Sequence, residues 1–321
     1  MPTRRARKGS ALLTVLWLSA ALAAVAFALS NTVRSETDRA STAKEGLRCE
    51  YLASAGIERA SMELLWSALY PARRMIPAGA TQVDLAFPTG MTRVRIIPET
   101  AELNVNTIAR ADFLRLATAL GIDPVLAANI ALELEQRRNP LTAMQINPGL
   151  NPTFQAQAAS FQNIEDLLQV RGMTPEILFG MWEPAVDAEG RESLAPRPGL
   201  ADCLSVYGSN DRVDANTAPA PVLAAVGMEP QVIAALLQRR AQSPLAPEEL
   251  SQFLNSLGSV NNRLRVGGNT IVTLRATARL RLPDGRLSDV ARTSAAQIKF
   301  MPDDRYSPIH ILRWYDTAWG N

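Results

Sequence analysis

The sequence has little of the side-chain chemistry that enzymes and metal sites use. It contains one histidine, His310, and two cysteines, Cys49 and Cys203, in 321 residues. These residues cannot form a zinc site of standard spacing. No serine or cysteine near His310 has the sequence context of a nucleophile, and no glycine-rich phosphate-binding loop is present. We therefore expect no catalytic activity, and we expect His310 to be a packed or surface side chain of a strand.

A strong excess of basic residues is also absent. The chain has 33 basic and 31 acidic residues, a formal net charge of +2. Four of the basic residues lie in residues 4–8, so the rest of the chain carries 29 basic and 31 acidic residues, a net charge of −2. Nucleic-acid-binding proteins usually present a clustered basic face, so this balance argues against such a partner.

The cysteines and the acidic residues each allow one structural hypothesis, a disulfide and a calcium site. An exported location permits a disulfide between Cys49 and Cys203, but two cysteines so far apart could equally be unpaired and buried. Acidic residues also gather in expected loops, at Asp187, Glu189, Glu192, Asp202, Asp211 and Asp214. Loop oxygens are the ligands that calcium requires, although the spacing is not that of an EF-hand and solvated carboxylates are the commoner explanation. Structural calcium is thus a hypothesis, and no other cofactor is expected.

One long stretch has no charge at all. Residues 10–30 form an apolar run of 21 residues, and no charged side chain lies between Lys8 and Arg34. A helix of about 20 residues crosses the bilayer core, and the basic residues before the run place that end in the cytoplasm. A secretory signal cleaved near Ser30 and an uncleaved single-pass anchor are both compatible with this pattern.

The helical pattern continues beyond the apolar run to Tyr70. One apolar stripe recurs at spacings of three, four and seven, and consists of Ala43, Leu47, Tyr51, Ala55, Met62, Leu65 and Leu69. A continuous helix over residues 10–70 would be about 90 Å long. We expect half of it in lipid and the other half with its stripe packed against a globular head.

Alternating segments predict an antiparallel sheet on this helix. Candidate strands cover residues 82–87, 92–97, 270–282, 290–300 and 309–315, with turn residues at Pro88-Thr89-Gly90 and Pro283-Asp284-Gly285. The expected fold class is therefore α+β, with a long N-terminal helix packed on one sheet.

Between the two groups of strands lies a long helical insertion with an internal repeat. Each copy contains an Asn-Thr pair, a helix, a Gly-x-x-Pro turn and a helix ending in Arg-Arg. The pairs are Asn106-Thr107 and Asn216-Thr217, the turns begin at Gly121 and Gly227, and the arginines are Arg137-Arg138 and Arg239-Arg240. We expect helix-hairpin-helix units with the Asn-Thr pairs as N-caps, a related hairpin at residues 164–175, and loops at 141–157 and 184–198.

Helix-hairpin-helix units often bind the DNA backbone, so nucleic-acid binding is an alternative role for these hairpins. The residues two positions after the hairpin glycines are Asp123, Thr174 and Glu229. Two carboxylates at the place of a phosphate would repel it. Arginine pairs late in a helix also complement the helix dipole. A packing role is therefore favoured over nucleic-acid binding.

The basic leader ending in Lys8-Gly9, next to a long apolar helix, resembles the class III leader of type IV pilins and pseudopilins. This resemblance implies that a prepilin peptidase cleaves between Gly9 and Ser10 and that the mature N-terminus is methylated. Most members carry a glutamate at the fifth mature position, which here is Thr14.

Further features resemble the general secretion pathway protein K family, the large minor pseudopilins of type II secretion systems. They are the start Ala11-Leu12-Leu13, the non-glutamate Thr14, the large helical insertion, and the phrases Val170-Arg171-Gly172-Met173-Thr174 and Asp214-Ala215-Asn216-Thr217-Ala218. The resemblance implies a subunit at the pseudopilus tip, in the inner membrane with its bulk in the periplasm. Implied partners are the minor pseudopilins I and J (and H), the prepilin peptidase and the inner-membrane assembly platform.

These expectations divide the chain into five parts. They are a leader (1–9), a transmembrane part of the helix (10–33), the periplasmic half of the helix with the first strands (34–100), an inserted all-α domain (101–258) and the C-terminal strands (259–321). Because helices associate by apolar faces, the expected partner interface is Ala43, Leu47, Tyr51, Ala55 and Met62. The alternative function is that of a DNA-uptake pilin that uses its hairpins on nucleic acid.

Overall fold

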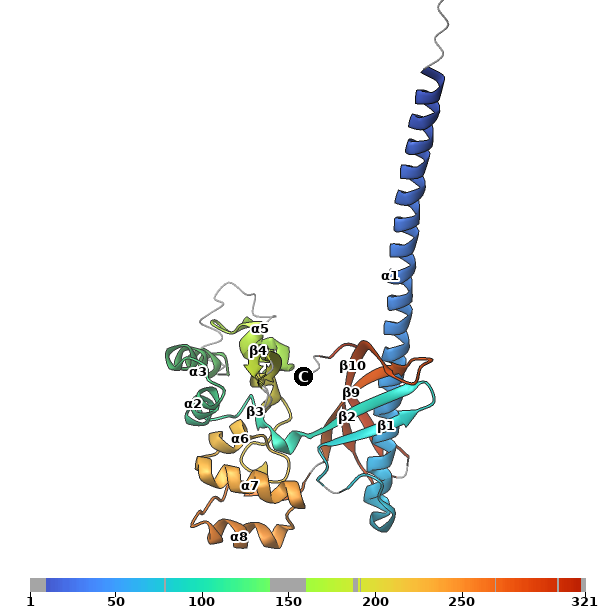
Figure 1. Ribbon diagram of the computed structural model, residues 1–321. Helices are drawn as coiled ribbons and strands as arrows, with labels where there is room; N and C mark the ends of the chain where they lie inside the picture. The colour runs from blue at the N-terminus through green and yellow to red at the C-terminus, as the bar shows by residue number, and fades with distance from the viewer. Residues whose placement is uncertain are drawn as a thin grey trace, which may run out of the picture.

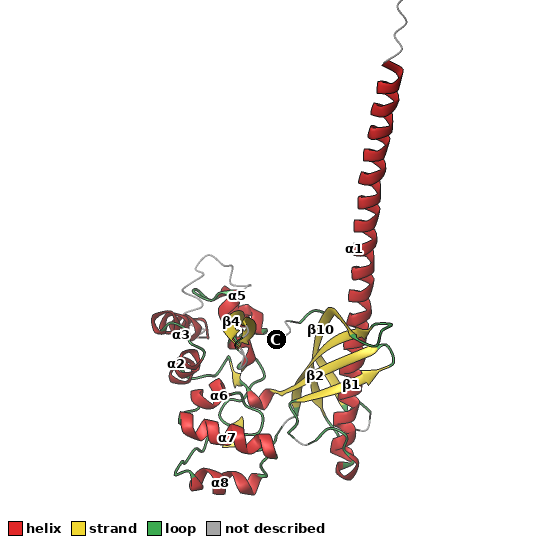
Figure 2. Ribbon diagram, in the orientation of Figure 1, coloured by secondary structure: helices red, strands yellow, loops and turns green. Residues whose placement is uncertain are grey.

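A computed structural model describes residues 10–77, 79–138, 160–186, 190, 192–268, 270–304 and 306–318. Its main parts are a long N-terminal helix, a five-stranded sheet against the second half of that helix, and a mostly helical body beside the sheet (Figures 1 and 2). This is an α+β, pilin-like arrangement, as the sequence pattern predicts. The expected leader, residues 1–9, lies outside the described residues.

The N-terminal helix α1 runs without a break over Ser10–Leu69, 60 residues. At 1.5 Å per residue it is about 90 Å long. No proline interrupts it before Pro71, which opens the short 3-10 helix η1 (Pro71–Arg73). Its first half stands clear of the rest of the chain, while its second half lies along the sheet (Figure 1). The predicted single continuous helix is thus confirmed.

All five predicted strands form one sheet. They are β1 (Gln82–Phe87), β2 (Gly90–Pro98), β9 (Ile271–Arg281), β10 (Leu287–Phe300) and β11 (Ile309–Tyr315), in the spatial order β1-β2-β9-β10-β11. Every neighbouring pair is antiparallel. The central pair β2–β9 joins segments from before and after the insertion, with Pro98 opposite Val272. The central strand pair therefore forms only when the segments before and after the insertion have come together.

The face of α1 that packs on the sheet is not the predicted stripe. Leu52, Ala53, Ile57 and Ala60 of α1 pack in the cluster that holds Val94, Leu274 and Ala276 of the sheet, and Gly56 is buried beside them against Thr92. By contrast, Leu47, Tyr51 and Met62 are 52%, 70% and 58% exposed. The expectation that the larger stripe packs on the head was wrong, because small side chains let the backbone of the helix approach the strands closely.

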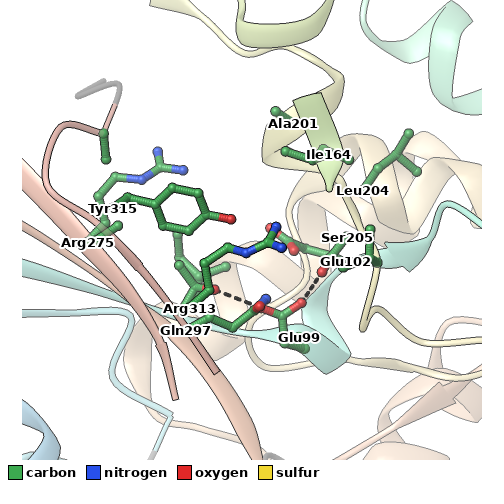
Figure 3. A pocket seen from close by; sticks show the side chains of 15 residues that line it. Glu99, Glu102, Ile164, Ala201, Leu204, Ser205, Arg275, Gln297, Arg313 and Tyr315 are labelled. Atoms are coloured by element: carbon green, nitrogen blue, oxygen red, sulfur yellow. Dashed lines mark hydrogen bonds between the residues drawn. The ribbon is translucent and has the colours of Figure 1, made fainter. Parts of the chain in front are cut away.

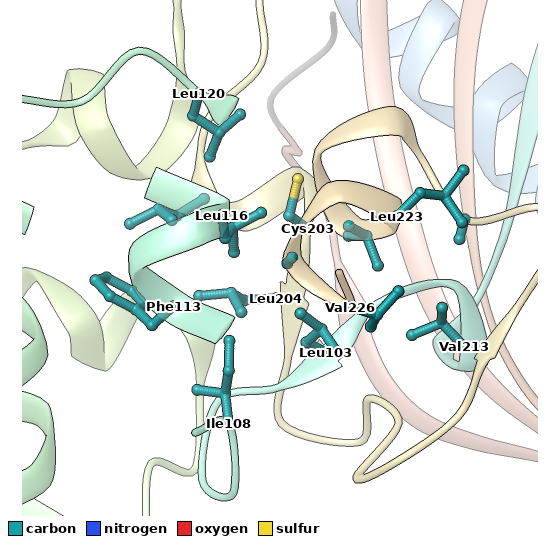
Figure 4. Close-up of a cluster of buried hydrophobic side chains, with 14 of the residues drawn as sticks. Leu103, Ile108, Phe113, Leu116, Leu120, Cys203, Leu204, Val213, Leu223 and Val226 are labelled. Carbon is teal, nitrogen blue, oxygen red and sulfur yellow. The ribbon is translucent and has the colours of Figure 1, made fainter. Parts of the chain in front are cut away.

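The insertion lies between β2 and β9 and has a core of its own (Figure 4). Its helices are η2 (Glu99–Ala101), α2 (Arg110–Ala119), α3 (Pro124–Arg138), η4 (Ile164–Gln169), α5 (Pro175–Phe179), η5 (Leu200–Asp202), α6 (Ala220–Ala225), α7 (Pro230–Gln242) and α8 (Pro247–Ser256). Side chains from both repeat copies meet in this core, among them Phe113 and Leu116 of α2 and Leu223 of α6. The two copies therefore fold as one unit.

The insertion is not all helical. Two short parallel pairs, β3 (Leu103–Asn104) with β6 (Leu204–Ser205) and β7 (Val213–Asp214) with β8 (Leu264–Arg265), lie within it. A hairpin of β4 (Met181–Val186) and β5 (Glu192–Arg197) occupies the segment expected as a loop at 184–198. The expectation of an all-α domain was therefore wrong.

Since β8 pairs with β7, the insertion also extends beyond the expected boundary at residue 258. The second expected loop, residues 141–157, lies outside the described part.

The repeat is confirmed, but its Asn-Thr pairs do not cap helices. The N-cap positions of α2 and α6 are Ala109 and Pro219. Instead, the amide of Asn106 accepts from Phe161 N–H (2.7 Å) and donates to Phe161 O (3.1 Å). Asn216 makes the same two bonds with Leu245, at 2.9 and 3.0 Å. Each asparagine thus fixes the segment that follows the second helix of its copy.

Candidate functional site

The first half of α1 is a membrane-length apolar helix. Among the described residues, α1 is the one helix long and apolar enough to cross a bilayer, and none of its apolar window is buried by the protein. Large side chains such as Leu16, Trp17 and Phe27 are exposed on it. This is consistent with a single membrane anchor. Thr14 lies on this exposed half, whereas Gly9 lies outside the described residues and the side chain of Ser10 is not described.

A second group of exposed apolar side chains lies on the second half of α1, on the side away from the sheet. We call it the partner face, and it comprises Leu47, Tyr51, Met62, Trp66 and Leu69, all exposed. Ala43 is exposed and Ala55 is half-buried at its edge. The predicted stripe includes Leu47, Tyr51, Met62 and Leu69 of this face, whereas its member Leu65 is buried. The sheet covers one surface of α1, and the opposite surface is open and carries these apolar side chains, with Glu58 between Tyr51 and Met62. The open surface is therefore the candidate site for helix association.

The end of the partner face carries aromatic rings that the stripe did not include. Trp66 and Tyr70 lie with ring centroids 4.5 Å apart, at an interplanar angle of 40°. Both side chains are about half exposed. Tyrosine and tryptophan are favoured at protein interfaces because they offer a large apolar body with a polar tip. Four-residue spacing to Met62 was the signal that could have found Trp66 in the sequence.

A buried polar cluster holds the insertion against the sheet (Figure 3). Glu99, at the end of β2, is 2% exposed. Its carboxylate accepts from Gln297 Nε2 of β10 and Thr273 Oγ1 of β9, each at 2.7 Å, and from Ser205 Oγ of the insertion. Both strands and the insertion are therefore bonded to one side chain. A buried carboxylate with three donors from separate elements fixes the angle at which the insertion leaves the sheet.

A second carboxylate beside it is less well satisfied. Burial raises the pKa of the Glu102 carboxyl well above its ordinary value of 4.5, and nearby Glu99 raises that pKa further. Arg275 and Arg95 act in the opposite direction. Arg275 also lies 3.6 Å from Asp202 of the insertion, while burial lowers the pKa of its guanidinium. The junction between the sheet and the insertion thus brings together the ionisable residues Glu99, Glu102, Asp202 and Arg275.

The arginines of the repeat face the protein rather than an open surface. Arg138 donates to Ile108 O (2.8 Å), and its counterpart Arg240 donates to Ala215 O and Ala218 O (3.0 and 2.7 Å). Arg137 donates to Gln169 Oε1 (2.6 Å) and Arg239 to Ser243 Oγ (2.8 Å). These contacts support the packing role over phosphate binding.

The hairpin carboxylate of the first copy is also used internally. Asp123 Oδ1 accepts from the N–H groups of Val125 and Leu126, at 3.0 and 2.9 Å, so it caps α3. An anion at that helix N-terminus would meet a carboxylate already in place. The packing interpretation of the hairpins therefore agrees with both their arginines and this acid.

The calcium hypothesis receives no support from the described residues. Among them, no three His, Cys, Asp or Glu side chains lie together as metal ligands. Asp214 is buried and accepts from Thr217 Oγ1 (2.5 Å) and Gly267 N–H (3.1 Å), while Asp202 faces Arg275 and Asp211 is exposed. Asp187 and Glu189 lie outside the described part of the chain. Glu192 is exposed on β5, and the four described carboxylates thus do not fit a common calcium ion.

The two cysteines do not form a disulfide. Cys49 and Cys203 are both free and buried. Cys49 is on α1, with its Sγ 3.5 Å from Val290 O of β10, whereas Cys203 is in the core of the insertion (Figure 4). Burial raises the pKa of both thiols. The proposed pairing was therefore wrong, because the two side chains belong to different cores.

In fold, the chain is similar to a chain of a solved secretion complex. No protein-family model matches it, and no curated protein matches it. A chain of the crystal structure of the GspK–GspI–GspJ complex from the enterotoxigenic Escherichia coli type 2 secretion system aligns with a TM-score of 0.49 and 16% sequence identity. The alignment covers 85% of this chain and 98% of that chain.

Proposed function

We propose that this protein is a minor pseudopilin of a type II secretion system, placed at the tip of the pseudopilus. In this role it starts pseudopilus assembly and so supports export of folded proteins from the periplasm across the outer membrane. The role is one of assembly rather than catalysis. The observation that carries the proposal is that α1 is one continuous helix whose first half is apolar over a membrane length, while exposed apolar side chains of the partner face lie on its second half, away from the sheet.

The composition of the membrane half supports a terminal position. In pilin-like filaments, the glutamate at the fifth mature position pairs with the N-terminal amine of a neighbouring subunit inside the membrane. An unpaired charge in lipid is costly, so this pairing guides the addition of each subunit. Thr14 has no charge to offer. A subunit of this kind is poorly suited to the repeating shaft, where every member must accept a neighbour.

The shape of the head supports the same position. The insertion lies beside the sheet and makes the head much wider than the helix and sheet alone (Figure 1). The cluster around Glu99 fixes it to two strands, so it cannot simply swing away. A wide, fixed head hinders another subunit from stacking above it. The first subunit of a fibre has no neighbour on that side.

The partner face is the proposed binding surface for the other subunits. Its occupants in this proposal are the N-terminal helices of the minor pseudopilins I and J, with H, which the resemblance of the leader and insertion implies. Helices of this kind have apolar faces that pack in ridges and grooves. The assembly platform of the inner membrane and the prepilin peptidase are further proposed partners.

Co-purification from membranes tests the partner face. The full chain carrying Leu47→Arg or Tyr51→Arg should fail to co-purify with coexpressed I and J proteins, because a buried unpaired guanidinium in a helix interface is strongly destabilising. Val125→Arg is the matched control, since Val125 is an exposed apolar residue of α3 in the insertion. A complex that forms unchanged with both α1 variants contradicts the assignment. Antibody labelling that finds the head all along a fibre contradicts the tip position.

A gel shift tests the alternative of a DNA-uptake pilin. Phosphate-driven binding is strongest at low salt. The full chain in detergent should leave duplex DNA unshifted under these conditions, because the repeat arginines are already bonded to the protein. A shift that is lost on Arg239→Gln would favour the nucleic-acid function instead.

A further inference from the structure

The open face of the sheet, opposite α1, bears a groove that the proposed function does not use. We call it the arginine groove. Its floor is β2, β9 and β10, with Arg93, Arg279, Thr277 and Thr293, and the hairpin residue Trp182 lines it from the side of the insertion. Its volume is about 510 Å³. A groove of this size accommodates several side chains of a ligand.

The floor of the groove is basic because of strand alternation. In β2 and β9, the small and aliphatic residues point to α1, and the residues between them point to the open face. Arg93 lies opposite Thr277, and Met91 lies opposite Arg279. The described lining residues include two guanidinium groups and no carboxylate. Positive charge is therefore concentrated on this floor.

These guanidinium groups are available to a ligand. Arg93 donates to both oxygens of Asp84, at 2.8 and 2.9 Å, but both side chains are more than a third exposed, so the pairing is weak. Arg279 is exposed and has no ion pair with any carboxylate of the described residues. An incoming carboxylate can therefore bind Arg279 directly and share Arg93 with Asp84.

The wall of the groove is apolar. One face of the β4–β5 hairpin holds it to the insertion through Arg197, which donates to Glu183 Oε1 and Leu120 O, both at 2.8 Å. The opposite face carries Trp182, Val186 and Leu194, which are 54%, 70% and 64% exposed. The register places them on one side, since Pro184 pairs with Leu194. Grouped exposed apolar side chains of this kind mark an interaction surface.

The groove continues past Trp182 along β2. The next cavity, of about 500 Å³, is lined by Arg95 and Gln82 on the sheet and by Pro196 and Pro198 on the insertion, and also by the carboxyl-bearing residues Glu102 and Asp202. Pro196 pairs with Trp182 across the hairpin, so the two cavities share a wall. Arg93 and Arg95 are two residues apart on one strand face, a separation of about 7 Å. An extended peptide repeats its own side chains on one face at the same interval.

We propose that the arginine groove binds an extended acidic segment of a partner polypeptide, with carboxylates and apolar side chains in alternation. Its carboxylates face Arg93 and Arg279, where guanidinium groups form paired, charge-assisted hydrogen bonds. Its apolar side chains face Trp182 and, farther along, Pro196. This inference goes beyond the proposed function and does not depend on the partner face of α1.

A direct binding measurement tests it. The probes are nine-residue fluorescein-labelled peptides of alternating Glu and Val, alternating Gln and Val, and alternating Lys and Val, added to the full chain in detergent. Fluorescence anisotropy should rise for the Glu peptide at concentrations up to about 1 mM. The Gln peptide should bind at least about tenfold more weakly and the Lys peptide not at all, because charge-assisted hydrogen bonds are lost or reversed.

Variants locate the binding. Arg93→Gln with Arg279→Gln should weaken binding of the Glu peptide at least about tenfold and flatten its salt dependence. Trp182→Ala should weaken binding without changing the salt dependence. Arg171→Gln is the matched control, since Arg171 is an exposed arginine of the insertion away from the groove. Circular dichroism confirms that each variant is folded.

Three results would overturn the proposal. They are no binding of the Glu peptide, equal binding of the Gln peptide, and binding unaffected by the paired arginine substitutions. A peptide with a benzophenone side chain at its centre gives an independent measurement. Its cross-links should map to β2, β9 or the β4–β5 hairpin, and cross-links confined to α1 would also overturn the assignment.

Discussion

Gly56 of α1 lies directly against Thr92 of β2, and a β carbon built on Gly56 would be 2.3 Å from Thr92 Cγ2. Thr92 is fully buried, and its Oγ1 donates to Leu52 O at 3.1 Å, so the helix and the strand are both bonded and in close contact here. The position of α1 on the sheet therefore depends on a residue without a side chain.

We expect Gly56→Val to destabilise the head by about 1–3 kcal/mol, because the added methyl groups must displace a buried strand. Urea unfolding followed by circular dichroism measures the free energy of unfolding. Ala68→Val, at an exposed position of α1, should cost only about 0.5 kcal/mol of helix propensity. Thr92→Ser removes the clashing methyl group and should partly rescue Gly56→Ala. Equal stability of Gly56→Val and Ala68→Val would show that the contact is not tight.

Loss of the side-chain amide should lower the free energy of unfolding to a similar extent at Asn106 and at Asn216. Asn216→Ala removes both bonds to Leu245 and should lower the free energy of unfolding by about 1–3 kcal/mol. Asn216→Asp keeps the acceptor but cannot donate to Leu245 O, so it should also destabilise. The same changes at Asn106 should act on Phe161. Asn255→Ala, on the exposed side of α8, is the control and should be near neutral. Near-neutral values at Asn106 and Asn216 would contradict their role as clamps.

The junction should make stability depend on pH. Because burial raises the pKa of Glu102 in the folded chain above 4.5, the folded state holds its proton more tightly than the unfolded state. The free energy of unfolding should therefore fall as pH rises above 4.5, by up to about 1.4 kcal/mol for each pH unit in which only the folded state is protonated. Glu102→Gln should remove this decline, whereas Glu36→Gln, on the exposed helix, should not. A decline unchanged in Glu102→Gln would assign it to another group.

Processing of the N-terminus tests the leader directly. N-terminal sequencing of the native chain from membranes should begin at Ser10. Gly9→Val should leave the full-length chain, because the residue before the cut must be small to enter the peptidase, while membrane insertion through residues 10–30 continues. Leu12→Ile provides a control that keeps an apolar residue after the site. A native chain beginning near residue 31 would instead identify a cleaved secretory signal.

Periodicity was sufficient to predict the elements that depend on local pattern. The helix over residues 10–69 and all five strands of the main sheet follow from runs with a clear period of 3.6 or 2. The helices of the repeat were also predicted, since each Gly-x-x-Pro turn marks the end of one helix and the start of the next. Gly121 and Gly227 have φ of +70° and +86°, values at which glycine is favoured.

Tertiary contacts explain what periodicity could not predict. The pattern of large residues pointed to Leu47 and Tyr51 as the packed face, but close helix–strand contact selects small residues such as Ala53 and Gly56. Pro184 and the polar residues near it suggested a loop, although the segment pairs across a hairpin that lies apart from the main sheet. Asn106 and Asn216 had the composition of caps but bond to segments distant in sequence.

The candidate site was predictable only in part. The stripe was assigned both to the head and to a partner interface; most of its members are exposed, which rules out the packing on the head, and the partner interface stays a prediction. The junction around Glu99 and Glu102 was missed because charged residues between strands are usually solvated. Nothing local distinguishes them, and their burial depends on strands β9 and β10 that come much later in the chain.

The position of the insertion has a consequence for how such a chain can be altered. The backbone leaves the sheet at Pro98 and re-enters it at Ile271, on two antiparallel neighbours whose ends lie side by side. The whole insertion therefore occupies the place of a simple turn. A cassette bounded at these two residues can be exchanged for a few turn-forming residues without breaking a pair of the main sheet, which would leave a slender head of helix and sheet alone.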